Sequence, residues 1–352
     1  MANATSIEWT DFTSNPLKYR DRATGRDVWA CVKHSPGCAH CYSEALARRY
    51  GRGGPFTRAA TEQVEPYLDD QELRRLLAQK KLAGKRVFVG DMTDVFGDWV
   101  PDALLDGLFA VLALRQDVTF QVLTKRADRM RAYTARLAAG IGPLEAAARA
   151  MGRTFKFTGL DGREYSTCPW PLPNVWLGVS VEDQTRADER IPHLLDTPAA
   201  VRYLSCEPLL GPLVLNTDET VFYCNGCGRV TAGRDGDCAA CGDCRTRERC
   251  YLDYLDWVVA GGESGGGARP CKVAWLRSLR DQCAAFRVAF FCKQLGSRPE
   301  GDDFAPAAAD PATGLTTLEV RQVLTVRDRK GGDPAEWPHD LRVRQFPEPR
   351  RR

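Results

Sequence analysis

The sequence predicts an α/β protein built on a full or partial (β/α) barrel. Short apolar runs rich in β-branched and aromatic residues alternate along the chain with longer segments whose leucines recur at helical spacing. The short runs are apolar at successive positions, which is typical of parallel strands that helices cover on both faces. An open dinucleotide-binding sheet is disfavoured, because no G-x-G-x-x-G motif follows the first strand and the Gly-rich segment 261–267 comes too late in the chain.

The expected elements follow one another in a regular order. Residues 1–30 are expected to hold an entry strand and a turn-rich loop, and Asp69 or Asp70 can cap the helix that ends near Gly84. Pro101 fits the first turn of another helix. Strands are expected at 86–90, 118–124, 174–181, 201–206, 255–262 and 288–294. Helices are expected at 43–50, 69–84, 101–115, 127–139, 184–197 and 273–287, so that six to eight β/α units fit in the chain.

Two interruptions and a tail define the expected domains. Residues 1–215 and 255–296 form the barrel, within which 140–173 hold a helix and a polar insertion. Residues 216–254 form a Cys-rich insertion, and 297–352 form a polar, Pro- and Gly-rich C-terminal extension. The length of 352 residues itself allows one large domain or two modest ones.

Composition and cysteine usage point to a reducing compartment. The net charge of +3 is too small to indicate a nucleic-acid partner by itself. No apolar run is long enough for a membrane span, and the first residues lack the pattern of a secretory signal. Nine of the 14 cysteines fall in the tracts 31–41 and 224–250, which indicates metal binding in the cytoplasm rather than a disulfide scaffold.

The first of these tracts, with the spacing C-x6-C-x2-C, is the most informative motif. Cys38 and Cys41 can face one inorganic centre, and the turn at Pro36-Gly37 can bring Cys31 to the same place. Three thiolates leave one iron of a 4Fe–4S cluster open for another ligand. A zinc site is the alternative, in which His34 or His40 supplies the fourth ligand that a closed structural site needs.

Several runs resemble a phage-associated family of three-cysteine, radical-SAM-like proteins whose domain has no assigned function. The resemblance covers most of the chain in the family's order, although the cysteine spacing differs from the commonest radical-SAM form, C-x3-C-x2-C. The runs include GRDVWACVKHSPGCAHCYSEALARRY, RVFVGDMTDVFGDWVP, TFQVLTKRADRM, PLPNVWLGVSVEDQTRADERIPHLL, VRYLSCEPLLGPL, LDWVVAGGESGGGARP and VAFFCKQLG.

The resemblance implies a barrel of the radical SAM type, a 4Fe–4S cluster on Cys31, Cys38 and Cys41, and S-adenosylmethionine as cofactor. The reduced cluster would cleave S-adenosylmethionine to a 5′-deoxyadenosyl radical that abstracts hydrogen from the substrate. Polar residues at the carboxyl ends of six strands suggest a ligand pocket, although they could instead pair with one another across the rim. The resemblance assigns cofactor binding to His40, Gly90, Asp91, Thr93, Ser180, Glu182, Gly261, Gly262 and Glu263, and substrate binding to Lys125, Arg126, Glu207 and Lys293.

The Cys-rich insertion carries a second metal motif. Two C-x2-C pairs followed by glycine are typical of a zinc ribbon, and a segment this polar needs metal to organise it. The expected zinc ligands are Cys224, Cys227, Cys238 and Cys241, whereas Cys244 and Cys250 are left over. A second iron–sulfur cluster is therefore an alternative for the insertion.

These observations lead to one principal function and two alternatives. The principal hypothesis is a radical SAM enzyme that takes electrons from a donor such as a flavodoxin or ferredoxin and modifies a base of phage-type nucleic acid or its precursor. The first alternative is a zinc-dependent nucleic-acid-binding or adaptor protein on a catalytically inactive barrel. A metal-dependent hydrolase ranks last, because the four histidines form no H-x-H or H-E-x-x-H motif.

Overall fold

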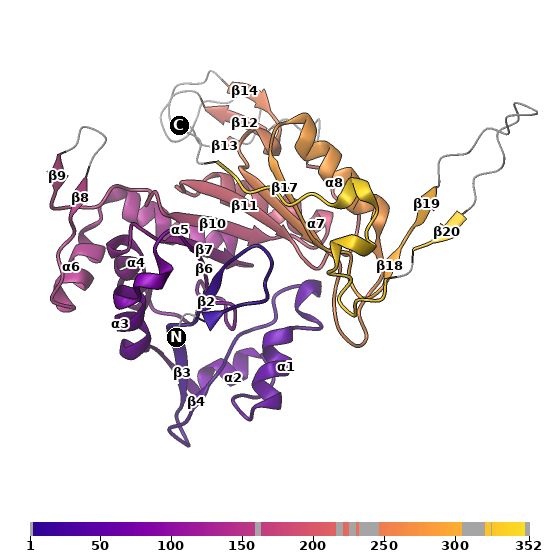
Figure 1. Cartoon of the computed structure of the whole chain (residues 1–352). Helices are drawn as coiled ribbons and strands as arrows, with labels where there is room; N and C mark the ends of the chain where they lie inside the picture. Colours follow the sequence, from indigo (N-terminus) through magenta and orange to yellow (C-terminus); the bar gives the residue numbers. More distant parts are fainter. Residues whose placement is uncertain are drawn as a thin grey trace, which may run out of the picture.

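The computed structural model describes residues 3–158, 163–215, 221–224, 230–231, 246–304, 321–324 and 326–348. Its centre is an eight-stranded sheet that curls into a half-barrel and stays open between its first and last strands (Figure 1). The order is β1 (Asn3–Ala4), β2 (Phe12–Ser14), β6 (Arg86–Val89), β7 (Thr119–Thr124), β10 (Val175–Ser180), β11 (Val201–Cys206), β15 (Trp257–Gly261) and β17 (Ala289–Gln294). All neighbours are parallel except β1 and β2, which confirms a partial barrel.

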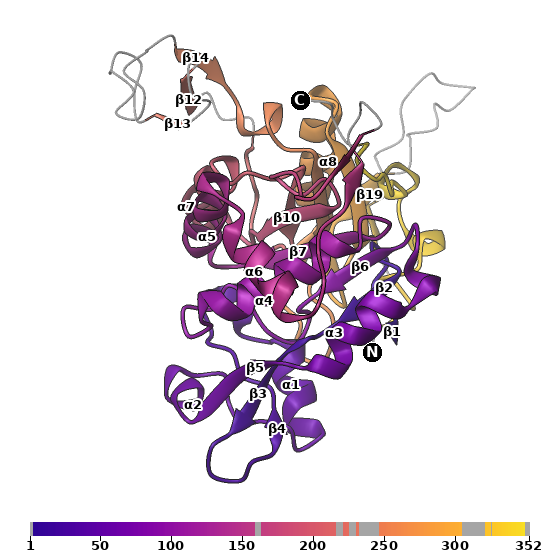
Figure 2. The same ribbon diagram turned by 90° about the vertical axis from the view of Figure 1, so that its left-hand side faces the viewer.

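Helices between the parallel strands cover the convex face of the sheet (Figure 2). They are α4 (Asp102–Leu114), α5 (Ala127–Ala139), α6 (Gly142–Ala150), α7 (Gln184–Leu195) and α8 (Val273–Ala285). Strand residues that point outward, such as Val122, Leu177 and Val258, belong to the large core beneath these helices. The strands are therefore apolar on both faces, as their sequence predicts. Within the described residues, no helix has the length and apolar composition of a membrane span.

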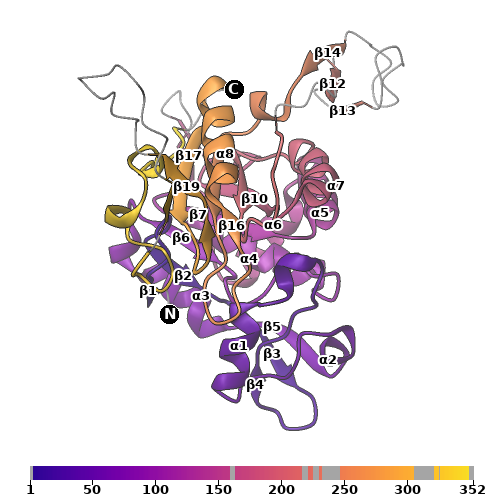
Figure 3. The same ribbon diagram turned by 90° about the vertical axis from the view of Figure 1, so that its right-hand side faces the viewer.

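The loop after β2 contains a subdomain that combines two predicted helices, at 43–50 and 69–84, with a small sheet that the sequence does not predict. It consists of an antiparallel sheet of β4 (Asp27–Val28), β3 (Leu17–Asp21) and β5 (Val64–Leu68) together with α1 (Tyr42–Arg49), α2 (Arg58–Glu62), which packs on β5, and α3 (Asp70–Ala78). Most of this subdomain lies below the main sheet in Figure 3. It shapes the surroundings of the three N-terminal cysteines, because the segment that carries them joins β4 to α1.

Smaller elements decorate the half-barrel. They are the pairs β8 (Phe157–Thr158) with β9 (Glu164–Tyr165), β16 (Cys271–Lys272) with β18 (Pro299–Glu300), and β19 (Asp302–Phe304) with β20 (Arg321–Val323). The Cys-rich insertion contains the antiparallel sheet of β13 (Val230–Thr231), β12 (Val221–Cys224) and β14 (Thr246–Arg249). The predicted zinc ligands Cys227, Cys238 and Cys241 lie outside the described residues, as does the side chain of Cys224, which ends β12.

Aromatic side chains fill the concave side of the half-barrel. Trp9, Phe88, Trp176, Tyr203, Trp257 and Phe291 form this cluster. Trp257 is fully buried and packs edge-on against Trp176, with ring centroids 5.8 Å apart. The C-terminal segment closes over it, because the indole N–H of Trp257 donates to the backbone oxygen of Gln345 at 2.8 Å. A dry aromatic floor thus lies beneath the carboxyl ends of the strands.

Gly178 on β10 tests how tightly this floor is packed. A Cβ at this position would lie 2.5 Å from Cζ of Tyr203, which is itself fully buried. Replacement of Gly178 with alanine is expected to lower the free energy of unfolding by about 1–3 kcal/mol, because neither ring nor strand can move away freely. Urea denaturation of the purified protein measures this change. Gly211→Ala, whose Cβ would meet no atom within 4 Å, is the matched control and is expected to change stability little.

Candidate functional site

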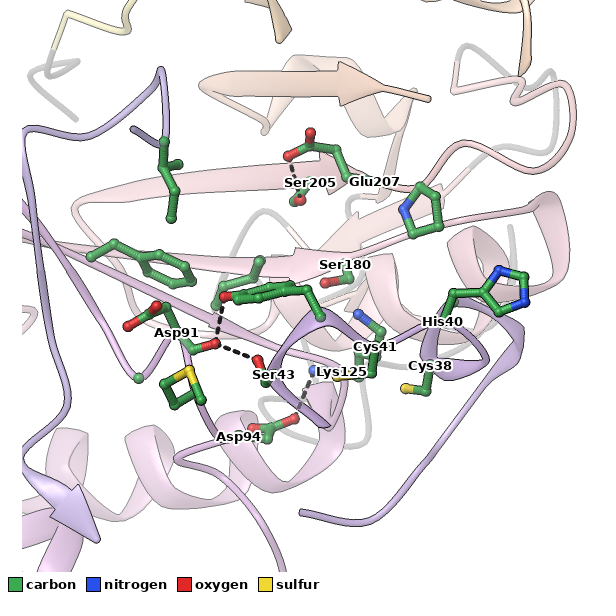
Figure 4. Close-up of a pocket in the computed structure, with 18 of the residues that line it drawn as sticks. Cys38, His40, Cys41, Ser43, Asp91, Asp94, Lys125, Ser180, Ser205 and Glu207 are labelled. Carbon is green, nitrogen blue, oxygen red and sulfur yellow. Dashed lines mark hydrogen bonds between the residues drawn. The ribbon is translucent and has the colours of Figure 1, made fainter. Parts of the chain in front are cut away.

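A cavity of about 620 Å³ opens at the carboxyl ends of the strands (Figure 4). One wall is formed by strand ends, including Asp91 after β6, Lys125 after β7, and Ser180 and Ser205 on β10 and β11. The opposite wall is formed by residues 31–41, here called the cysteine loop, and by the first turns of α1. In a barrel of parallel β/α units, this edge is where binding and catalytic residues gather.

All three cysteines of the loop line the cavity, as free thiols. Burial raises the pKa of the Cys31 thiol to about 12, so a metal must displace its proton on binding. The backbone N–H of His34 points at Sγ of Cys38 at 3.5 Å. The structure therefore places the three thiols that the sequence singles out in the wall of one cavity.

The local fold of the cysteine loop follows from its sequence. Pro36, Gly37 and Cys38 form one turn of 3₁₀ helix, and the N–H of Cys38 donates to the carbonyl of Ser35 at 2.9 Å. Cys41 occupies the position just before the first residue of α1. The predicted turn at Pro36-Gly37 is confirmed, and it brings Cys38 and Cys41 to the same side of the cavity (Figure 4).

Glu182, two residues after the end of β10, holds the cysteine loop. Its side chain is fully buried, and its Oε1 accepts the N–H of Gly37 at 3.1 Å. The guanidinium of Arg190 on α7, also buried, donates to Oε2 at 3.0 Å. Burial pushes the pKa of Glu182 upward, but the charges of Arg190 and Lys125 outweigh it and hold the pKa below its usual value. Glu182 is thus ionised and bound on both sides.

Glu263 holds the loop from the other side. Its Oε2 lies 2.9 Å from Nδ1 of His40, and Arg269 donates to Oε1 at 2.6 Å and to Oε2 at 3.0 Å. Arg269 also donates to the carbonyl of Pro36 at 3.0 Å. Burial acts to raise the pKa of Glu263, yet the hydrogen bonds from Arg269 and His40 prevail and lower it to about 2.

This low pKa predicts how the stabilising contacts of Glu263 with Arg269 and His40 depend on pH. Because the folded-state pKa of Glu263 lies below its ordinary 4.5, its contribution to stability is complete above pH 4.5 and is lost as pH falls toward 2. The contribution at neutral pH is roughly 3 kcal/mol. Urea midpoints of the wild type and of Glu263→Gln should differ most at pH 7 and converge at pH 2.5. A difference that is unchanged at pH 2.5 would contradict this account.

Two further contacts fix the start of the loop. Arg126, which is buried, donates to the carbonyl of Val32 at 3.0 Å and pairs with Asp94 at 3.0 Å. The hydroxyl of Thr93 donates to the carbonyl of Ala30 at 2.8 Å. Backbone carbonyls of the loop are therefore bound by donors, whereas its amide at Gly37 is bound by an acceptor.

Most of the predicted site residues line the cavity. They are Cys31, Cys38, His40, Cys41, Gly90, Asp91, Thr93, Lys125, Arg126, Ser180, Glu207, Gly262, Glu263 and Lys293. Glu182 and Gly261 do not line it. The carboxylate of Glu182 is occupied by the loop, and Gly261 lies on β15 with Oε1 of Glu207 about 3.0 Å from where its Cβ would be.

Several of the charged residues pair with one another across the rim, which is the alternative that the sequence leaves open. Glu207 pairs with Lys293 at 3.1 Å, and Asp94 with Arg126. Asp91 and Lys125 make no ion pair with any described residue and remain available to a ligand. Burial raises the pKa of the Asp91 carboxyl, against the opposing hydrogen bond from Asn15. The hydroxyl of Ser180 faces the same space (Figure 4).

Sequence reasoning misses several residues of the site. Arg190 and Arg269 are absent from the predicted set, because their partners Glu182 and Glu263 are identified only by the fold. Tyr42 and Ser43 also contribute, since both hydroxyls donate to the backbone carbonyl of Asp91. The adjacency of Tyr42 and Ser43 to Cys41 is a signal that could have included them.

The arrangement of the possible metal ligands helps to distinguish a zinc ion from an iron–sulfur cluster at the cysteine loop. Across the part of the chain that the structure describes, no group of three or more His, Cys, Asp or Glu side chains is arranged to hold a single metal ion. The ring of His40 is engaged by Glu263, and that of His34 lies 3.9 Å from Glu189. The zinc alternative thus has no preformed site in the loop. A cluster needs no common point, because each thiolate binds a different iron.

Fold and site together define an α/β half-barrel protein with a thiol-lined cavity at the carboxyl edge of its sheet. The chain belongs to the family described as Protein of unknown function (DUF5131), whose model matches residues 4–330. No curated protein and no solved structure matches it. The family match spans the half-barrel, the cysteine loop and the Cys-rich insertion.

Proposed function

We propose that this protein is a radical SAM enzyme of the cytoplasm, in which Cys31, Cys38 and Cys41 hold a 4Fe–4S cluster. The observation that carries the proposal is the position of the cysteine loop. It lies after β2, the first parallel strand, and contributes three free thiols to a cavity at the carboxyl edge of the half-barrel. The donor set fits such a cluster, because three thiolates leave one coordination site for a further ligand.

When bound, the reduced cluster would supply the electron that cleaves S-adenosylmethionine and yields a 5′-deoxyadenosyl radical for hydrogen abstraction. The chain's own residues would bind and orient the cofactor. The Asp91 carboxylate can accept the ammonium group of S-adenosylmethionine, and the Ser180 hydroxyl can bind a sugar hydroxyl. The cavity volume of about 620 Å³ lies within the range of cofactor sites, and the aromatic floor keeps water out from below.

The polar contacts of the loop support this assignment in a second way. Glu182 and Glu263 bind one part of the loop, and Arg126 and Arg269 bind its carbonyls. The backbone that carries the three cysteines would therefore be held in place before metal arrives, which helps to preorganise a site. The electron would come from a donor such as a flavodoxin or ferredoxin. A base of phage-type nucleic acid is the substrate that we propose.

Anaerobic reconstitution with iron and sulfide tests the proposal. The protein should turn brown, bind about four irons per chain through the loop, and release 5′-deoxyadenosine from S-adenosylmethionine when dithionite is added. Zinc in the Cys-rich insertion should be measured in the same sample by metal analysis. A colourless product that contains zinc alone would contradict the proposal and favour the zinc-dependent adaptor.

A further inference from the structure

Helix α1 connects the cavity with the outer surface of the subdomain. Tyr42, Ser43 and Leu46 line the cavity from this helix. Residues three and four positions apart lie on one face of a helix, so Arg49 and Tyr50 continue the same stripe outward. Tyr50 is 66% exposed, and the guanidinium of Arg49 lies over its ring at 5.9 Å. The stripe therefore runs from the cavity to a solvent-facing aromatic ring beside a cation.

Positive charge is concentrated around this stripe. Residues 45–61 contain four arginines and no Asp or Glu, whereas residues 15–78, which span the whole subdomain, carry a net charge of +3 from eleven Lys and Arg and eight Asp and Glu. Lys33 and Arg48 share one carboxylate, that of Glu44, at 2.9 Å and 3.2 Å. Arg49 and Arg52 pair with no carboxylate of the described residues. The surface next to the cavity mouth is thus positive and unneutralised.

A purely structural explanation accounts for only part of this arrangement. Arginines in the last turn of a helix interact favourably with its dipole, which suits Arg48 and Arg49. The helix dipole does not explain Arg52, which lies beyond the helix, or the exposed ring of Tyr50. Cations that alternate with exposed aromatic rings are typical of surfaces on which bases of a single strand stack while phosphates are neutralised.

We propose that Arg49, Tyr50 and Arg52, here called the α1 track, bind single-stranded nucleic acid and lead one of its bases into the cavity. The proposal deepens the proposed function by naming the substrate as a strand rather than a free nucleotide. A single strand is favoured over a duplex because a base must leave its stack before it can enter a cavity. Binding itself needs neither the cluster nor S-adenosylmethionine.

Fluorescence anisotropy of the full chain with a fluorescein-labelled single-stranded DNA oligonucleotide tests this inference. Arg49→Glu/Arg52→Glu should weaken binding at least tenfold at low salt. The association constant of the variant should also depend less steeply on salt. The negative slope of its logarithm against log salt should shrink in magnitude by about 0.7 for each phosphate that is no longer neutralised. Tyr50→Ala should weaken binding about tenfold with the slope unchanged, because stacking is not screened by salt. Thermal melting checks that each variant is folded.

Arg74→Glu is the matched control. Arg74 lies on α3, pairs with Asp70 at 3.5 Å, is 82% exposed in its side chain and does not line the cavity. This single charge reversal should leave binding unchanged, whereas the single reversal Arg49→Glu should weaken it. An equal fall in affinity in this variant, or no binding by the wild type, would overturn the inference. Tighter binding of a hairpin duplex would also overturn it. The inference would likewise be overturned if the double variant bound DNA normally but its cluster could no longer be reduced by an acidic electron-donor protein. The α1 track would then bind the electron donor instead of the strand.

The two proposals fail in distinguishable ways. The anisotropy is measured without reductant or S-adenosylmethionine, so a protein that takes up no iron can still bind the strand. Conversely, a reconstituted protein that cleaves S-adenosylmethionine but binds no oligonucleotide would retain the proposed chemistry and rule out the α1 track.

Discussion

Replacement of Cys38 with alanine is expected to abolish cluster binding and every activity that depends on it. Cys38 lies at the end of the 3₁₀ turn and faces the cavity, and no described thiol other than Cys31 and Cys41 lines that space. Two thiolates cannot hold a 4Fe–4S cluster tightly. Iron content after anaerobic reconstitution should fall from about four per chain to a small fraction of that value, and 5′-deoxyadenosine should be undetectable.

Cys168→Ala is the control for this experiment. Cys168 is a buried free thiol that does not line the cavity, and burial raises its pKa to about 11. Its removal also takes away one cysteine, but iron content and absorption spectrum should be retained. A Cys38 variant that binds as much iron as the wild type would locate the cluster elsewhere, with the cysteines of the insertion as the next place to look.

Glu182→Gln is expected to produce the second large effect. The amide can still accept the N–H of Gly37, but the guanidinium of Arg190 is left as a buried charge without its counterion. Removal of one partner of a buried ion pair typically lowers the free energy of unfolding by roughly 3–5 kcal/mol. Urea denaturation at pH 7 measures this change. The apoprotein suffices, so the result does not depend on the proposed chemistry.

A double variant separates the two roles of Glu182. In Glu182→Gln/Arg190→Met both charges are gone, and much of the stability should return, because apolar replacement of a buried pair is often neutral or better. Nε and Nη2 of Arg190 also have no hydrogen-bond partner among the described residues. If the double variant were as unstable as the single one, the ion pair would not be the cause.

The sheet was predictable because each parallel strand carries its own signal. Runs such as 175–179 and 257–260 are apolar at successive positions, and burial on both faces demands this pattern. The sheet of β3, β4 and β5 was not predictable, since its strands are short and half-exposed. Leu17 and Tyr19 are buried, but charged residues stand beside them, and the pairing partner Val64–Leu68 lies more than 40 residues away.

The candidate site was likewise predictable only where residues close in sequence form it. The three cysteines could be predicted to share one cavity because they are close in sequence and separated by turn residues. The direction of a side chain at a strand end cannot be read in this way. Glu182 was expected to bind the cofactor, whereas its carboxylate faces Gly37 and Arg190. Only the fold determines which of two neighbouring polar residues faces the open space.

The hydrogen bonds that hold the cysteine loop have a consequence for iron loading. Because the fold itself holds the backbone of the loop, uptake should be limited by the delivery of iron and sulfide rather than by refolding of the chain. A chelator should then leave an intact scaffold that can be reloaded repeatedly. In this respect the protein should differ from small zinc domains, which unfold when their metal is withdrawn.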